Sequence, residues 1–135
     1  MTDAPAENAQ ELIAEFVDEA RAFGLHLEIC PSSNVQTGAA VSIAAHPITA
    51  LWRAGISVSV HTDNPLFSRT SMSGEAAALL RETPLTTADL LAMTRGAAAA
   101  SFLGIAALEA ALKRIEAAAR GEPARGQNRA NEGRQ

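Results

Sequence analysis

The run from Ile56 to Pro65 constrains the fold more than any other part of this 135-residue chain. Its β-branched residues alternate with small or polar ones, which is the period of a β-strand with two unlike faces. The aliphatic face suits a covering helix, and the polar face suits the inside of a barrel. The strand ends in an acidic turn that contains Asp63. In α/β enzymes, metal ligands and acid–base groups lie at this end of a buried strand.

A second strand is predicted from Leu25 to Cys30, where apolar and polar residues also alternate, and Pro31 ends it. A loop from Ser32 to Gly38 is expected to follow. Apolar residues at helical spacing predict the remaining elements. These are helices at about 8–23 (ended by Gly24), 47–54 (opened by Pro47 and ended by Gly55), 73–82, 87–101 and 105–120.

The last two helices carry more specific expectations. Thr86 and Asp89 form a T-x-x-D pattern that predicts a capping box at the start of the 87–101 helix. In the 105–120 helix we expect Leu108, Leu112 and Ile115 to be buried, because they share one face.

The element order α-β-α-β-α-α-α predicts parallel strands joined by helical crossovers. The two strand ends, Cys30 and Asp63, are about 33 residues apart. An eightfold division of a barrel of roughly 250 residues gives about 31. Doubly wound sheets give similar spacings, so spacing alone leaves both α/β architectures open.

The chain is long enough for one domain but too short for a complete eight-stranded barrel. Residues 1–7 are expected to be a flexible lead-in and 8–120 the folded domain. Residues 121–135, rich in glycine and arginine, are expected to be a disordered tail whose arginines are solvated.

Composition excludes several classes of protein. The net charge of −4 argues against nucleic-acid binding, which requires a basic face. No apolar stretch of about 18 residues is present, so no membrane span is expected. Cys30 is the single cysteine, so an intrachain disulfide is excluded and the cytoplasm is the expected compartment.

Two strand ends carry the candidate chemistry. Asp63 and Asn64 are either turn residues before Pro65 or a metal-binding or catalytic carboxylate with an amide beside it. The Cys30–Asn34 segment is either a loop held by its own polar side chains or a ligand-contacting loop at the same edge. Cys30 has no neighbouring base or cation in sequence, so a nucleophilic role is not expected.

The three histidines do not complete a metal site. We expect His26 to be structural and His46 to cap or pack a helix start, whereas His61 shares a strand face with Asp63. No H-x-H, H-x-x-x-H or C-x-x-C pair occurs in the chain. A catalytic zinc normally takes three or four protein ligands, so the metal-site pattern within this sequence is incomplete.

The segment LEICPSSNVQTGAAVSIAAHPITALWRAGISVSVHTDNP, followed by TSMSGE, resembles the C-terminal part of an adenosine deaminase. The resemblance runs from about residue 10 to about residue 115. It rests on C-P-S-S-N-V-Q-T, H-P-I and T-D-N-P occurring in this order and at this spacing. The motif S-V-H-T-D-N-P is similar to the signature of the family's eighth strand, usually written S-L-N-T-D-D-P.

The resemblance implies the C-terminal part of a (β/α)8 TIM barrel, about two βα units with trailing helices, whose strands seven and eight are Leu25–Cys30 and Ile56–His61. It implies a zinc ion bound by Asp63, which also orients the water that replaces the purine amino group. The metal's role is to lower the pKa of that water. The implied partner is a small purine nucleoside, with neither nucleic acid nor membrane.

Asn64 stands where the family has a second aspartate that contacts the purine N7 atom. Because N7 is an acceptor, an asparagine NH₂ can donate to it at any pH, so purine binding can survive this change. His61 stands where the family has a small or amide residue. The family's zinc histidines and its proton-donating glutamate belong upstream of the matching segment.

Three hypotheses follow. The first is a C-terminal fragment of an adenosine-deaminase-type aminohydrolase, inactive alone, because Asp63 by itself would bind zinc feebly. The second is a non-catalytic module that binds purine or completes a barrel with a partner chain that covers its open sheet edges. The third is a small α/β domain whose motif match is accidental.

Overall fold

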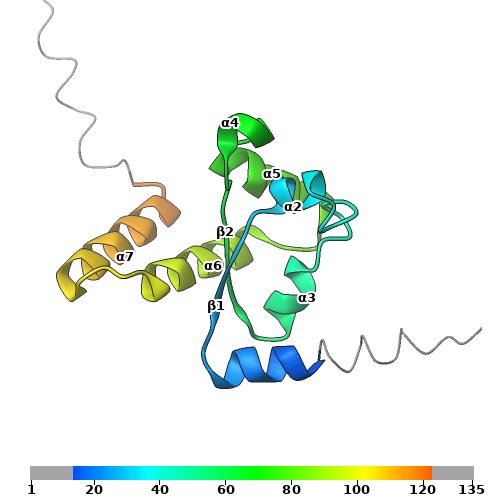
Figure 1. Ribbon diagram of the computed structural model, residues 1–135. Coiled ribbons are helices and arrows are strands. Elements are labelled where there is room, and N and C mark those ends of the chain that lie inside the picture. The colour runs from blue at the N-terminus through cyan, green and yellow to red at the C-terminus, as the bar shows by residue number, and fades with distance from the viewer. Residues whose placement is uncertain (1–13, 123–135) are drawn as a thin grey trace, which may run out of the picture.

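The computed structural model describes residues 14–122 of the chain (Figure 1). Residues 14–22 are helical and precede the first strand. The remaining elements, in chain order, are β1 (His26–Ile29), α2 (Pro31–Gln36), α3 (Ile48–Arg53), β2 (Ser57–Val60), α4 (Pro65–Ser68), α5 (Met72–Glu82), α6 (Thr87–Ala100) and α7 (Ile105–Ala119).

The two strands pair in parallel, in a register that places His26 opposite Ser57 and Ile29 opposite Val60. The amide of His61 donates to the carbonyl oxygen of Ile29 at 2.8 Å and continues the ladder past β2. The prediction of parallel strands with a helical crossover is therefore confirmed. Because the pair is parallel, both strands end at the same edge. That edge carries Cys30 and the segment from His61 to Asn64.

The aliphatic face of the strands is buried under helices, as the alternation predicts. Val58 is 1% exposed and lies in a core to which α3, α5 and α6 each contribute a fully buried side chain, namely Ile48, Leu79 and Met93. Complete burial of a side chain of this size stabilises the fold by about 1.5–3 kcal/mol. The helices on this face therefore fix the strand pair and, with it, the shared edge.

Glycines end the helices that precede each strand, also as predicted. Gly24 has a φ of 63°, and the amide of Leu25 reaches back to the carbonyl of Ala20 at 2.9 Å. Gly55 has a φ of 80° after α3. Glycine adopts this left-handed conformation without the steric cost that other residues have.

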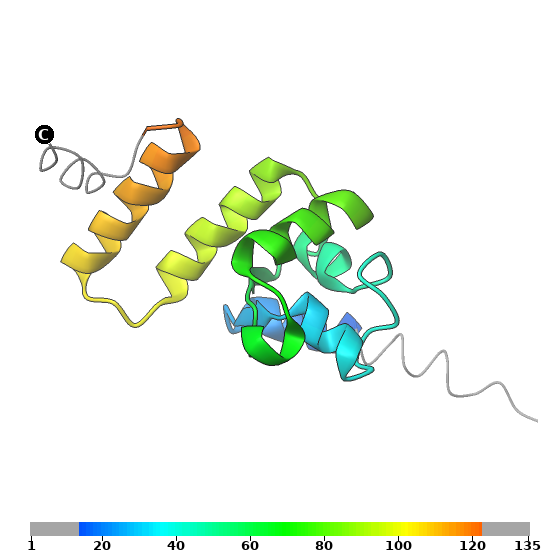
Figure 2. The same ribbon diagram turned by 90° about the horizontal axis from the view of Figure 1, so that it is seen from above.

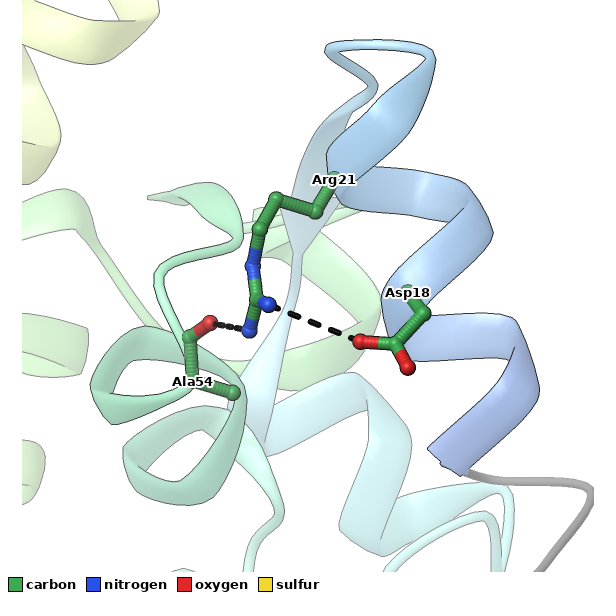
Figure 3. Close-up of polar contacts among 3 residues, drawn as sticks. All are labelled: Asp18, Arg21 and Ala54. Carbon is green, nitrogen blue, oxygen red and sulfur yellow. Dashed lines mark hydrogen bonds and ion pairs between the residues drawn. The ribbon is translucent and has the colours of Figure 1, made fainter.

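Arg21 ties the first helical segment to the end of α3 (Figure 3). Its guanidinium donates to the carbonyl oxygen of Ala54, the last acceptor before Gly55. Asp18 lies 3.5 Å from the same guanidinium, but both side chains are exposed, so this ion pair contributes little. The hydrogen bond to Ala54 thus holds the two helices together near the ends that precede the strands.

The capping box at α6 is confirmed. The Asp89 amide donates to Thr86 Oγ1 at 3.2 Å, and the Thr86 amide donates to Asp89 Oδ2 at 2.7 Å. Trp52 Nε1 donates to the other carboxylate oxygen at 2.9 Å and joins α3 to α6. These bonds, those from Thr86 foremost, hold the pKa of the Asp89 carboxyl below its usual range.

Two expectations about the loops are wrong. The segment expected as a loop from Ser32 to Gly38 forms the short helix α2, which begins at Pro31. Proline suits the first helical position, and the Asn34 amide closes the first turn on the Cys30 carbonyl at 2.8 Å. The acidic turn also continues into an unpredicted helix, α4, with Pro65 at its start.

The expectation that α7 buries its apolar face is also wrong. Leu108, Leu112 and Ile115 are only half-buried, and α7 has no buried residue among those described. Figure 2 shows that α7 turns back beside α6, and among residues 14–122 the helix α6 is its main neighbour, so much of its surface is left uncovered by that part of the chain.

Several sequence predictions concern residues outside the described range. These are the flexible lead-in at 1–7, the start of the first helix near residue 8, and the tail from residue 123 onward. Within residues 14–122, no helix combines the length and apolar character needed to cross a membrane.

His46 joins three parts of the fold and confirms the expectation that it caps a helix start. Its Nδ1 accepts from the Ile48 amide at 3.1 Å, at the beginning of α3. A neutral ring that accepts through Nδ1 carries its proton on Nε2, which donates to Asn34 Oδ1 of α2 at 3.1 Å. Burial lowers the pKa of His46, and the carboxylate of Glu75 opposes that effect.

We predict that replacing Thr86 with Ala lowers the free energy of unfolding by about 1 kcal/mol, because α6 loses its N-cap. Urea unfolding followed by circular dichroism measures this. Thr87→Ala is the matched control, since this neighbouring threonine lies inside the helix and is exposed. Equal stability of the two variants would contradict the role of the cap.

We predict that His46 makes the fold sensitive to mild acid. An unfolded histidine has a pKa near 6.5, and the folded value is lower. The stability contributed by neutral His46 is therefore complete above about pH 6.5 and is lost as the pH falls below it toward the folded pKa. His46→Gln should flatten the pH dependence of the unfolding free energy between about pH 7.5 and 5. Thr86→Ala should keep the original slope, and an unchanged slope in His46→Gln would count against this account.

Candidate functional site

The carboxyl edge of the strand pair brings Asp63 and the C-P-S-S-N segment together, as the sequence predicts. Ser33, on α2 just after β1, donates its Oγ hydrogen to Asp63 Oδ2 at 2.8 Å. The two residues are distant in sequence and meet because β1 and β2 are parallel neighbours. The contact fixes one oxygen of the Asp63 carboxylate, and the residue is exposed.

Asp63 has a left-handed backbone, with a φ of 57°. This conformation costs a residue with a Cβ about 1–2 kcal/mol, although aspartate tolerates it better than most. Unfavourable backbone geometry of this kind is concentrated at functional sites. Here it turns the chain from β2 into α4 and leaves the Asp63 carboxylate at the strand edge, where Ser33 meets it.

Asn64 caps α4. Its Oδ1 accepts from the Phe67 amide at 3.2 Å, so the cap uses the acceptor side of the side-chain amide. The NH₂ side does not take part in this bond and can donate elsewhere. Asn64 can therefore serve both as a turn residue that caps α4 and as a hydrogen-bond donor to a ligand.

Cys30 shares the edge with Asp63 but is a poor nucleophile. Burial, and next the nearby Asp63 carboxylate, raise the pKa of its thiol. A thiol with a raised pKa stays protonated at neutral pH, and only the thiolate attacks. This agrees with the expectation from sequence.

His61 faces back along β2. Its Nε2 lies 2.7 Å from Ser59 Oγ, and no hydrogen bond joins it to Asp63 within residues 14–122. His26 lies across the strand pair, with Nδ1 at 2.8 Å from Ser57 Oγ and Nε2 at 2.8 Å from Ser59 Oγ. The expected structural role of His26 is confirmed, and His61 belongs to the same hydrogen-bonded row.

Sequence reasoning missed two residues near the edge. Ser33 was one polar residue among several in its segment, and nothing in the pattern singled it out as the partner of Asp63. Glu75 lies in the T-S-M-S-G-E motif, yet its complete burial could not be expected from a helix start that reads as exposed. Both became visible only when distant segments were brought together.

The described residues do not form a zinc site by themselves. Within residues 14–122, no group of three or more histidine, cysteine, aspartate or glutamate side chains is arranged to hold a metal ion. Asp63 offers one carboxylate, where a catalytic zinc takes at least three protein ligands. The edge therefore supplies at most one part of such a site.

Comparison of structures gives the fold. An adenine deaminase from Arthrobacter aurescens superposes with a TM-score of 0.74 and 21% sequence identity, over 78% of this chain and 32% of that chain. The apo N6-methyl-AMP deaminase from Arabidopsis thaliana gives a TM-score of 0.68 and 27% identity, over 75% and 30% of the two chains. The described residues therefore share the α/β fold of one part of these larger deaminases.

Comparison of sequences gives the family. An adenosine deaminase of Mycobacterium sp. strain KMS is 49% identical over 77 residues, and one of Mycobacterium ulcerans is 47% identical over 77 residues. Each match covers 57% of this chain and 21% of the relative, so the chain spans about a fifth of the length of these curated relatives. The adenosine deaminase family model matches residues 7–118, and the chain therefore belongs to the adenosine deaminase family.

Proposed function

We propose that this chain is part of an aminohydrolase that converts adenosine and water into inosine and ammonia. One observation carries the proposal. Asp63 lies just beyond the end of β2 with a left-handed backbone, and Ser33, in the helix that follows β1, donates to its carboxylate at 2.8 Å. The family match includes this turn, and catalytic groups of α/β barrels lie at the carboxyl ends of the strands, which supports a role for the Asp63 carboxylate in acting on the reacting water.

We further propose that Asp63 is the one zinc ligand that the described residues contribute. Ser33 occupies Oδ2, which orients the carboxylate and leaves Oδ1 for a metal. Among the described residues, no group of three or more candidate ligands is arranged to hold a metal, so Asp63 would need ligands from elsewhere to bind a catalytic zinc.

Asn64 is proposed to bind the purine. Its Oδ1 is engaged by the Phe67 amide, which orients the NH₂ group as the free half of the side chain. A purine N7 atom is an acceptor and would take this hydrogen bond. Adenosine is the proposed substrate, and the same donor would serve adenine.

The described strands are proposed to be the seventh and eighth of a (β/α)8 barrel, within a domain that covers residues 8–120. The parallel pairing of the two strands, and the match to only 32% and 30% of the two structural relatives, support a place within a larger sheet. The cytoplasm stays the proposed compartment.

A second candidate is a non-catalytic module that completes a barrel with a partner chain. The observation in its favour is the sheet, which has only two strands among the described residues. Two-stranded sheets are marginal on their own and leave edges that invite pairing. Co-purification of a chain that carries an H-x-H motif would support this candidate, and a monodisperse monomer would argue against it.

We predict that the purified 135-residue chain releases no ammonia from adenosine above background and contains far less than one zinc per chain. The reason is that one carboxylate does not hold a catalytic zinc. A coupled ammonia assay and metal analysis of the same preparation test this. Robust turnover with stoichiometric zinc would show that the chain completes the site in a way that the described residues do not.

A further inference from the structure

Glu75 is a fully buried carboxylate that the proposed chemistry does not use. It lies in the first turn of α5 and is 0% exposed. Burial of a charged side chain is costly unless hydrogen bonds hold it, so such residues are rare in protein cores. A bulky apolar side chain would fill the same space at lower cost, which raises the question of what the carboxylate does here.

The contact that Glu75 makes lies on another segment. Its Oε2 accepts from the backbone amide of Ser32 at 3.2 Å. Pro31 has no N–H, and Cys30 makes no side-chain cap, so the Ser32 amide is the first donor of α2 that needs a partner. Glu75 provides that partner from a distant part of the sequence.

Ser32 immediately precedes the residue that holds Asp63. Ser33 donates to Asp63 Oδ2, and Asn34 receives the hydrogen bond of His46. Ser32, Ser33 and Asn34 have low helix propensity, so this short helix depends on contacts from outside it. The anchor at Ser32 is therefore well placed to set the position of Ser33.

We propose that Glu75 is a positioning residue, which anchors the start of α2 and thereby holds Ser33 against Asp63. The anchor links α5, which follows Asp63 in the chain, to the segment that follows β1. This clamp therefore joins a helix that comes after β2 to the helix that comes after β1. The importance of this clamp for catalysis rests on the proposed function of Asp63, but the clamp itself does not.

The test distinguishes the role of Glu75 as a hydrogen-bond acceptor from its role in filling space in the core. Glu75→Gln keeps an acceptor oxygen and the size of the side chain. Glu75→Met keeps the size and removes the acceptor. Glu82→Met is the matched control, because Glu82 lies on the same helix and pairs with Arg81 at the surface instead of with α2. The readouts are amide hydrogen exchange at Ser32 and the carbon chemical shift of the Asp63 carboxyl group, both by NMR.

We expect the Ser32 amide to be protected in the unchanged chain and in Glu75→Gln. In Glu75→Met it should exchange at least about tenfold faster, since it loses the carboxylate acceptor. The Asp63 carboxyl shift should move toward the value seen in Ser33→Ala, which removes the donor directly. Glu82→Met should leave both readouts unchanged.

A side chain that only fills the core predicts a different outcome. In that case, Glu75→Met would match the unchanged chain at both positions, and this result would overturn the proposal. If Glu75→Met does not fold, the unchanged chain and Glu75→Gln still test the proposal through protection of the Ser32 amide. An unprotected Ser32 amide in the unchanged chain, or its loss of protection in Glu75→Gln, would equally contradict the anchor. Neither readout depends on zinc or adenosine, so failure of the proposed function would leave this test intact.

Discussion

The parallel pairing of β1 and β2 is the constraint on which the rest of this structure depends. Four residue pairs, from His26 with Ser57 to Ile29 with Val60, bring two strand ends that are far apart in sequence to one edge. The pairing lasts because Val58 and its aliphatic neighbours are buried under α3, α5 and α6. Without this burial the strands would not stay paired, and the contact between Ser33 and Asp63 would be lost.

Polar residues around the strand pair divide into two groups with different roles. His26, Ser59 and His61 form a hydrogen-bonded row along one face, and Ser59 is 2% exposed beneath the two rings. Ser33, Asp63 and Asn64 lie at the carboxyl edge instead, and each has hydrogen-bonding capacity left over. Asp63 and Asn64 are exposed, whereas His26 and His61 are only partly exposed and Ser59 is buried, and for this reason we propose that the reacting centre lies at the carboxyl edge.

Much of the fold could be predicted from periodicity and end signals. Alternation of apolar and polar residues predicted both strands. Gly24 and Gly55 indicated helix ends, and Thr86 with Asp89 predicted a capping box. The short helix α2 was not predicted, because its serines and asparagine favour turns and its start is held by a tertiary contact of Ser32 with Glu75. The helix α4 was not predicted, because its single turn, capped by Asn64, is too short to show a periodic pattern. The expected burial of Leu108, Leu112 and Ile115 was wrong for a related reason. An amphipathic pattern shows which face of a helix is apolar but not how much protein is available to cover it.

Asp63 could be singled out from its place at a strand end, and its neighbour Asn64 from the resemblance to the family. Ser33 could not, because a single sequence contains no signal that joins it to Asp63. The central claim is that the Asp63 carboxylate is required for aminohydrolase chemistry. The most direct test co-expresses this chain with the upstream segment of a mycobacterial adenosine deaminase and measures ammonia release from adenosine. We predict activity that Asp63→Ala abolishes and that replacement of the surface residue Asp18 with Ala preserves. Equal activity of the Asp63→Ala and unchanged chains would contradict the account.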